Sequence, residues 1–188
     1  NESIYNSLCI KTLHGQNKDA LAKTQKGNWR YDIVEAGYKN NMTDIMAAIG
    51  QVELARYDSE TLPKRKVVCN QYINKLQEYS WAELPTYVTS EKEGSYHLFP
   101  LRIKNITEEQ RDAIVKEIFD CDVSVNVHFI PLPQMSFYRN LGYDMKNYPV
   151  TFDNYSREIS LPVFYDLTNE MVETVLNAVI KSVEKILK

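Results

Sequence analysis

The stretch GYKNNMTDIMAAIG, residues 37–50, places a lysine and two asparagines directly before the start of an apolar helix. Thr43 is a good N-cap, because its hydroxyl can accept a hydrogen bond from a free backbone N–H. Asp44 follows at the positive end of the helix, where a carboxylate is favourable. Four apolar residues then recur at the spacing of one helix face: Ile45, Ala48, Ile49 and Val52. The stretch predicts a capped helix with an apolar side at core spacing.

The groups ahead of this helix could form an anion site. Lys39 supplies a positive charge, Asn40 and Asn41 supply amide donors, and the first N–H groups of the helix point back toward them. The carboxylate of Asp44 already occupies the positive end, so an anion would be held mainly by loop side chains. On spacing alone, a capped helix after a polar loop, His14–Gly37, is the simpler interpretation, and the anion site is the alternative.

Farther along the chain, strand and helix patterns alternate. The run SYHLFPLRI, residues 95–103, alternates like a strand, and Pro100 inside it implies a sheet edge or a bulge. Thr107 and Gln110 form a capping box. They precede a helix that is expected to bury four residues: Ile114, Val115, Ile118 and Phe119.

Other helices are expected over residues 2–12, 58–79 and 151–157, with Pro63 tolerated near the beginning of its helix. A short extended ISLPVF segment comes before a last helix that starts after Thr168. That helix carries a continuous apolar stripe: Met171, Val172, Val175, Leu176, Val179, Ile180, Val183 and Leu187. These patterns predict one α+β unit from about residue 80 onward, preceded by linking helices.

The run VSVNVHF, residues 123–129, is the clearest strand pattern in the chain. Its period of two predicts an apolar core face of Val123, Val125, Val127 and Phe129, and a polar face of Ser124, Asn126 and His128. His128 leads into a proline-rich loop, so a functional role and a structural role both stay open for it. His97 shares a strand face with Phe99, Leu101 and Ile103 and is expected to be a core or interface histidine.

Composition excludes several classes of function. The net charge is −3 and the pI is about 5.7, with basic residues scattered among acidic ones, which argues against nucleic acid as a partner. The three cysteines form no CxxC, so a reducing, cytoplasmic protein without a disulfide framework is expected. No apolar run approaches the ~20 residues that span a bilayer, so we expect a soluble protein without a membrane partner. The three histidines lack metal-ligand spacing, and no GxSxG, P-loop or GxGxxG is present.

The stretch GYKNNMTDIMAAIGQVEL resembles the GYNYRMTDIQAALGLAQL signature of the DegT/DnrJ/StrS family of sugar aminotransferases. Further landmarks follow in the family's order over essentially the whole chain: LCIKTLHG, WRYDIVEAGY, SYHLFPLRI, VNVHFIPLPQMSFYRNLGY and SREISLPVFYDLTNEMVETVLNAVIKSV. The resemblance implies the C-terminal part of a type I pyridoxal phosphate enzyme with the aspartate aminotransferase fold. Residues 1–80 would end the large domain and supply interdomain helices. Residues 81–188 would form the small C-terminal α+β domain, an antiparallel sheet flanked by helices.

The same resemblance implies a homodimer that moves an amino group from glutamate to a nucleotide-linked keto sugar. The loop of Lys39, Asn40 and Asn41 would help to hold the cofactor phosphate in the neighbouring subunit's site, and the uncharged helix after it would be an interface or interdomain element. His128 matches a histidine near the sugar, whereas Pro133 replaces the family's second histidine. The family's Schiff-base lysine lies upstream of Asn1, so no catalytic residue is assigned here, and the fragment alone is expected to be inactive.

Two alternatives remain open. The family also contains pyridoxamine phosphate-dependent sugar dehydratases, in which a histidine replaces the Schiff-base lysine, and that position lies upstream of this chain. A noncatalytic dimerisation module is the second alternative. It predicts that changes at Lys39 or Asn41 leave the affinity for the cofactor untouched.

Overall fold

The computed structural model describes residues 1–16, 32–40 and 42–188. The chain divides into two units, Asn1–Ala55 and Arg56–Lys188, and each unit is described by itself. The polar loop expected over His14–Gly37 lies partly outside the described residues, and so does the predicted site residue Asn41.

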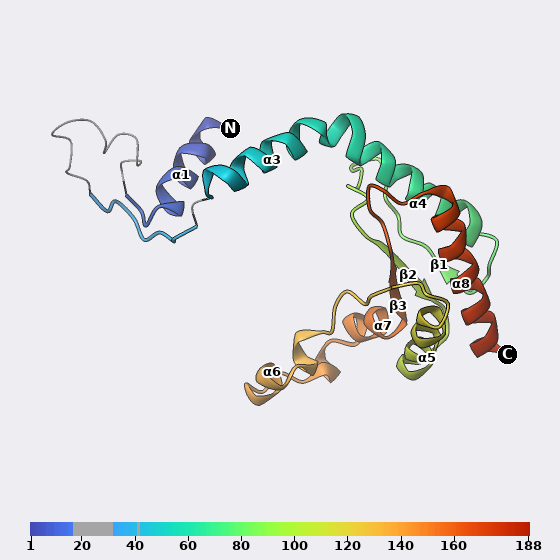
Figure 1. Cartoon of the computed structure of the whole chain (residues 1–188). Coiled ribbons are helices and arrows are strands. Elements are labelled where there is room, and N and C mark those ends of the chain that lie inside the picture. The colour runs from blue at the N-terminus through green and yellow to red at the C-terminus, as the bar shows by residue number, and fades with distance from the viewer. Residues whose placement is uncertain (17–31, 41) are drawn as a thin grey trace. The chain divides into compact units, whose positions relative to one another are not determined.

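The first unit contains the two helices that the sequence predicts, and a polar side chain caps the start of each (Figure 1). In α1 (Glu2–Thr12), the side chain of Asn1 accepts a hydrogen bond from the backbone N–H of Ser3 at 3.0 Å. In α3 (Asp44–Arg56), the hydroxyl of Thr43 accepts from the backbone N–H of Met46 at 3.4 Å. Local side-chain chemistry therefore sets where each helix begins.

The segments that follow α1 and precede α3 approach each other closely. Antiparallel bridges join Leu13 to Lys39 and Gln16 to Ile33. A Cβ atom on Gly37 would overlap the backbone of residues 14 and 15, and Gly15 itself has a φ of +77°. The two backbones can come this close only because both positions lack a side chain.

The apolar side of α3 does not form a core in the described chain. None of the α3 residues is buried, and Ile49 is 57% exposed. The prediction that this helix packs through Ile45, Ile49 and Val52 is therefore wrong for the described residues. The expectation that the helix is an interface or interdomain element stays a prediction, because an interface would cover the helix with another chain or domain.

The second unit starts with a turn of π-helix, η1 (Tyr57–Thr61), that runs directly into α4 (Leu62–Leu76). Pro63 lies in the first turn of α4, where a missing N–H breaks no helical hydrogen bond, so the prediction for this proline is confirmed. The helix is shorter than the expected span of 58–79 because its first residues form the π-helical turn and its last residues form a turn.

A small antiparallel sheet lies at the centre of the second unit. Its strands β1 (Ala82–Glu83), β2 (Phe99–Ile103) and β3 (Glu158–Leu161) are ordered β1-β2-β3. The register pairs Ala82 with Ile103 on one side of β2, and Phe99 with Leu161 on the other. The prediction of a small antiparallel sheet flanked by helices is therefore confirmed.

The sequence placed Pro100 at a sheet edge or a bulge, whereas the structure places it in the middle strand. Pro100 pairs with Ser160 of β3, but β1 reaches only as far as Arg102 and Ile103. On the side of β2 away from β3, no strand in the described chain pairs with Pro100. The missing N–H is tolerated there because β1 is too short to need it.

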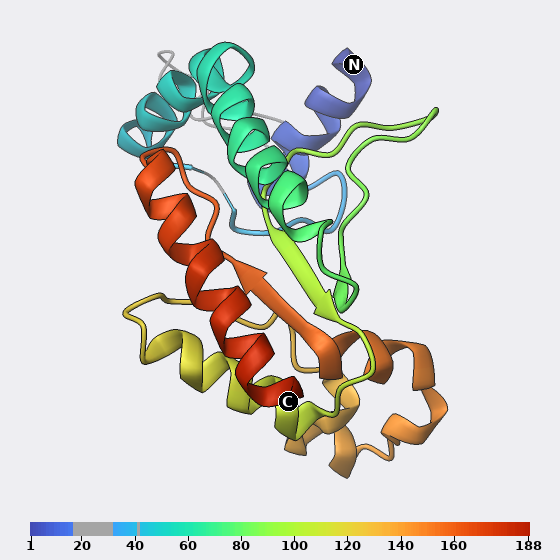
Figure 2. The ribbon, with the colours of Figure 1, turned by 90° about the vertical axis from the view of Figure 1, so that its right-hand side faces the viewer.

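Helices pack on one face of this sheet and enclose the core (Figure 2). They are α4, α5 (Glu108–Phe119) and α8 (Asn169–Leu187), and Figure 2 shows α8 running alongside β3. The capping box of α5 and the Thr168 cap of α8 are confirmed. The core takes its main side chains from these three helices and from β2 and β3: Val68, Tyr72, Leu76, Phe99, Leu101, Ile103, Ile114, Ile118, Ile159, Leu161, Val172, Val175, Val179 and Val183.

Some predicted core residues lie outside it. Phe119, Met171 and Leu187 are exposed because they fall at the helix ends or at the margin of the apolar stripe. His97 is also exposed, so the prediction that it lies in the core is wrong, because β2 begins only at Phe99, and the alternative that it lies in an interface stays a prediction. The side chain of His97 instead lies 3.4 Å from Arg65 of α4.

The remaining segments connect α5 to β3. They contain η2 (Leu132–Gln134), α6 (Ser136–Asn140), η3 (Met145–Asn147) and α7 (Pro149–Arg157), and α7 confirms the helix expected over 151–157. Of the helices in the described residues, none has the length and apolar character that a bilayer crossing requires.

The strand predicted over residues 123–129 is wrong. Only Asn126 bridges to the sheet, through paired backbone hydrogen bonds of 3.2 and 2.7 Å with Ser160. The next two backbone donors bind side chains instead: the N–H of Val127 donates to the Asn126 amide oxygen, and the N–H of His128 donates to Glu158. The ladder therefore stops after one bridge. Phe129, expected in the core, is 72% exposed.

Candidate functional site

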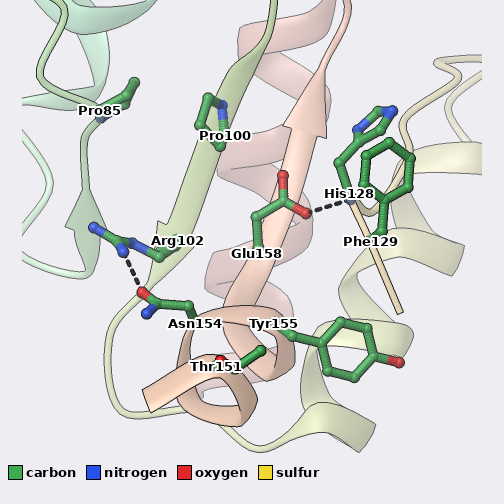
Figure 3. Close-up of a pocket in the computed structure, with 9 residues that line it drawn as sticks. All are labelled: Pro85, Pro100, Arg102, His128, Phe129, Thr151, Asn154, Tyr155 and Glu158. Carbon is green, nitrogen blue, oxygen red and sulfur yellow. Dashed lines mark hydrogen bonds between the residues drawn. The ribbon is translucent and has the colours of Figure 1, made fainter. Parts of the chain in front are cut away.

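The face of the sheet opposite the core lines a pocket of about 500 Å³ (Figure 3). Because side chains alternate along a strand, the residues between the core positions of β2 and β3 point to this face. Six of the side chains that line the pocket come from three separate stretches of the chain: Pro100, Arg102, His128, Asn154, Tyr155 and Glu158. The pocket thus depends on the fold, since the chain segments that form it are far apart in sequence.

A buried carboxyl group lies under one wall of the pocket. Glu158 is only 5% exposed, and its Oε2 accepts a hydrogen bond from the backbone N–H of His128 at 3.0 Å. Its Oε1 accepts a short hydrogen bond from the hydroxyl of Ser160. The same hydroxyl lies 2.8 Å from Nδ1 of His128. Burial raises the pKa of Glu158, although its hydrogen bonds with Ser160 and His128 oppose the shift.

On the opposite wall, Arg102 lines the pocket. Arg102 pairs with Glu83 at 2.6 Å and donates a hydrogen bond to Asn154, which Figure 3 shows reaching toward it. Arg157 pairs with the same Glu83 at 2.9 Å and with Asp153 at 2.6 Å. The hydrogen bond from Arg157 lowers the pKa of Asp153. The carboxylates of Glu83 and Asp153 balance the charges of Arg102 and Arg157, and the guanidinium N–H groups of Arg102 suit an oxygen-rich ligand.

Arg111 supports the site from below. Its side chain is almost fully buried and donates to the backbone oxygens of Tyr155 at 2.8 Å and Glu158 at 3.2 Å. The guanidinium also lies 4.8 Å from the centre of the Tyr155 ring. These contacts join α5 to the turn between α7 and β3, and so they fix where Tyr155 and Glu158 enter the pocket.

A second pocket, of about 330 Å³, adjoins the first at Thr151, which lines both. Its walls are mostly aromatic and apolar, with Tyr138, Tyr143 and Tyr148 on them. The rings of Tyr138 and Tyr143 meet edge to face, 6.2 Å apart. Together the two pockets offer a compartment that contains several polar side chains beside an aromatic one.

The predicted cofactor-binding residues belong to the first unit. Lys39 and Asn40 are exposed. The backbone N–H of Asn40 donates to the carbonyl of Thr12 at 3.0 Å, and the amide side chain takes no part in this hydrogen bond. Both residues come just before the Thr43 cap of α3. A cation and an exposed amide ahead of a helix N-terminus fit a phosphate group chemically. Asn41 lies outside the described residues.

The structure brings His128, but not Lys39 or Asn40, into the pocket described above, because these two residues belong to the other unit. In the described chain, no group of three or more His, Cys, Asp or Glu side chains is arranged to hold a metal ion.

Sequence reasoning missed Glu158, Ser160 and Arg102 as site residues. A signal was present, because Glu158 and Ser160 lie two positions apart in the run EISL and therefore share a strand face. A glutamate in an otherwise apolar short strand marks a polar face. The partner of that face, His128, could be found only from the tertiary structure.

Comparison with known proteins gives this geometry a context. The profile of the DegT/DnrJ/EryC1/StrS aminotransferase family matches residues 1–180. The uncharacterised protein MJ1066 of Methanocaldococcus jannaschii is 35% identical over 188 residues, covering 98% of this chain and 48% of that protein. UDP-4-amino-4,6-dideoxy-N-acetyl-beta-L-altrosamine transaminase of Campylobacter jejuni is 26% identical, covering 100% of this chain and 47% of the transaminase.

Among solved structures, Spr1654 from Streptococcus pneumoniae, assigned as a sugar aminotransferase, is similar in its PMP form with 40% identity and a TM-score of 0.86. That match covers 98% of this chain and 46% of the other. The PLP form of the same protein matches with 36% identity and a TM-score of 0.85, covering 100% and 45%. The chain spans about half the length of these relatives. The family profile covers nearly the whole chain, and the chain therefore belongs to the DegT/DnrJ/EryC1/StrS aminotransferase family.

Proposed function

We propose that this chain is the C-terminal part of a pyridoxal phosphate-dependent aminotransferase that moves an amino group from glutamate to a nucleotide-linked keto sugar. The observation that carries the proposal is the family match over residues 1–180, which coincides with a polar pocket on the sheet. The PMP and PLP forms of Spr1654 support the cofactor. The Campylobacter transaminase, whose name specifies a UDP-linked sugar, supports the class of substrate.

In this proposal the first unit contributes to cofactor binding. Lys39, Asn40 and Asn41 would hold the phosphate of the cofactor in the site of a second copy, since the enzyme would act as a cytoplasmic homodimer. The cofactor, when bound, supplies the electron sink that amino-group transfer needs. The exposed side chains of Lys39 and Asn40 ahead of α3 are the described groups that favour this role. Residues 1–80 would end the large domain and 81–188 would form the small one.

The second unit would bind the sugar nucleotide. His128, Arg102 and Asn154 offer hydrogen-bonding groups in the polar pocket, which suits sugar hydroxyls and a carbonyl. The adjoining aromatic pocket suits a flat ring such as a nucleobase, because aromatic side chains stack on such rings. Thr151 lines both pockets, so one two-part molecule could occupy them together.

The test uses the complete enzyme with Lys39→Ala, Asn40→Ala and Asn41→Ala, with the exposed Lys116→Ala of α5 as the control. We expect at least one of the three loop variants, Asn41→Ala above all, to lose cofactor. The readouts are the absorbance of the bound cofactor and its dissociation constant. Unchanged retention in all three would refute the loop's role and favour a noncatalytic dimerisation module.

A second experiment tests the proposed binding of the sugar nucleotide with the variant His128→Ala. We expect the KM for the sugar nucleotide to rise by about tenfold, the effect of one lost hydrogen bond, while the cofactor stays bound. Wild-type kinetics in this variant would remove His128 from the substrate site.

A further inference from the structure

The hydrogen-bonded chain from Glu158 through Ser160 to His128 gives each carboxyl oxygen a different partner. Oε2 faces a backbone N–H, that of His128 at 3.0 Å, which can only donate. Oε1 faces the Ser160 hydroxyl, which can donate or accept. The hydroxyl in turn lies 2.8 Å from Nδ1 of the imidazole. The backbone thus fixes which carboxyl oxygen can carry a proton.

The single hydroxyl proton links the state of the carboxyl group to the tautomer of the ring. When Glu158 is ionised, Ser160 donates to Oε1 and must accept from Nδ1–H, so Nε2 of the neutral ring is an acceptor. When Glu158 is protonated, the proton sits on Oε1 and is donated to Ser160. The Ser160 hydroxyl then donates to Nδ1, and Nε2 carries the ring proton. Nothing else in the chain has to move.

The protons balance along this path. A proton taken up at Nε2 lets the Nδ1 proton pass to the Ser160 oxygen and the Ser160 proton pass to Oε1 of Glu158. The ring stays neutral, and the added proton is stored on the buried carboxyl group. His128 lines the pocket, and Ser160 contacts its Nδ1 and not its Nε2. The switch between donor and acceptor therefore takes place at Nε2, the ring nitrogen that can bind a ligand.

We propose that Glu158 is a positioning residue which, acting through Ser160, sets whether His128 offers a donor or an acceptor to the sugar substrate. The inference rests on the proposed function for the identity of that substrate. A keto sugar presents a carbonyl oxygen, which needs a donor, whereas its aminated product presents an ammonium group, which needs an acceptor. A switchable histidine can meet both.

The surroundings of Glu158 support such a proton store. Its neighbours in the described structure are Arg102 of β2, Arg111 of α5 and Tyr155 of α7. Arg102 is already paired with Glu83. Arg111 binds the backbone oxygen of Glu158 and forms no ion pair with its carboxylate among the described residues, although its charge lowers the pKa of Glu158 and so opposes the effect of burial. Burial raises the pKa of Glu158, so this carboxyl group takes up a proton at a higher pH than an exposed one.

The test is ¹⁵N NMR of the complete enzyme labelled at histidine, with the His128 signals assigned through their loss in His128→Gln. In Glu158→Gln, the amide oxygen must face the His128 N–H, so the amide NH₂ faces Ser160. This isosteric variant mimics the protonated carboxyl group. We expect wild type well above the pKa of Glu158 to show the Nδ1–H form and Glu158→Gln to show the Nε2–H form at the same pH.

Two further variants serve as controls. Glu117→Gln removes a carboxylate that pairs with Lys185 at 2.6 Å on another face, and it should leave the tautomer as in wild type. Ser160→Ala breaks the relay, and adding Glu158→Gln to it should then change nothing. The kinetic counterpart is a change of about tenfold in the KM for the sugar in Glu158→Gln, with a flattened pH profile.

The outcomes separate the two proposals. The same tautomer in wild type and Glu158→Gln at every pH overturns the relay, whatever the enzyme does. A tautomer switch in a protein that aminates no sugar upholds the relay and refutes the proposed function. Aminotransferase activity in a protein whose His128 tautomer does not switch upholds the proposed function and refutes the relay.

Discussion

Among single residues, Glu158 has the environment that differs most from that of a surface carboxylate. It is buried under the pocket, and burial raises its pKa above the ordinary value of 4.5. A raised pKa in the folded state means that the folded protein binds this proton more tightly than the unfolded chain does. Its contribution to stability is therefore present below the ordinary carboxyl pKa and is lost as the pH rises through the folded-state value.

This sign gives a testable pH dependence. The Glu158→Gln variant cannot ionise, so the free energy of unfolding of wild type relative to this variant should fall as the pH rises above about 4.5. Thermal unfolding midpoints of both proteins across pH 4 to 8 would measure it. Parallel curves for the two proteins would contradict the assignment of a raised pKa.

Gly37 is a second residue with a specific structural role, because it lets two backbone segments approach closely. A Cβ atom there would overlap the backbone of residues 14 and 15, so Gly37→Ala should separate the two segments at a cost of about 1–3 kcal/mol. The backbone N–H groups of Tyr38 and Asn40, which donate to residues 11 and 12, should then exchange faster with solvent. Hydrogen exchange measured by mass spectrometry of the complete enzyme would report this change.

The matched control is Gly142→Ala. Gly142 has a φ of +92° but nothing near its would-be Cβ, so the substitution adds conformational strain without an overlap. It should leave exchange in residues 32–40 unchanged. Equal effects of both variants on that segment would show that close approach is not the reason for Gly37.

At the scale of elements, Arg111 joins α5 to the turn between α7 and β3. Arg111→Met removes the donor to two carbonyls, at Tyr155 and Glu158, in a region closed to water. Each unsatisfied group costs about 1–3 kcal/mol, so for two carbonyls we expect a loss of about 2–6 kcal/mol in the free energy of unfolding. Urea unfolding would measure the loss. The exposed Arg139→Met of α6 should change stability by less than about 0.5 kcal/mol, and a similar loss there would contradict the structural role of Arg111.

The helices of this fold could be predicted from the sequence because their signals are local. A cap such as Thr107 or Thr168 and an apolar stripe at a spacing of 3.6 lie within one segment. The absence of a strand over 123–129 could not be predicted, because it depends on Glu158 and Ser160, 30 to 34 positions away. Asn126 and Glu158 take the next backbone donors there, and alternation alone does not reveal that competition.

At the scale of the whole molecule, α3 is a helix with no buried residue in the described chain. Ile45, Ile49 and Val52 are exposed on it, and we propose a second copy as their cover. In the complete enzyme, Ile49→Glu would place a charge in an apolar interface and should shift the protein from dimer to monomer. Light scattering would measure the mass.

The control for that substitution is Val88→Glu, which puts the same charge on another exposed valine. It should leave the mass unchanged. A dimer that survives Ile49→Glu, or one that dissociates equally with Val88→Glu, would remove α3 from the interface.

The sequence by itself determined the family resemblance, the helices with their caps, and the antiparallel α+β character of residues 81–188. Each of these rests on short-range patterns: a cap, a stripe, or a motif read in order. The tertiary structure decided which polar groups meet. It placed Pro100 in the middle strand, took His97 out of the core, and set Glu158 and Ser160 beside His128. Those contacts join segments 30 to 60 residues apart, and only packing of the folded chain brings such distant groups together.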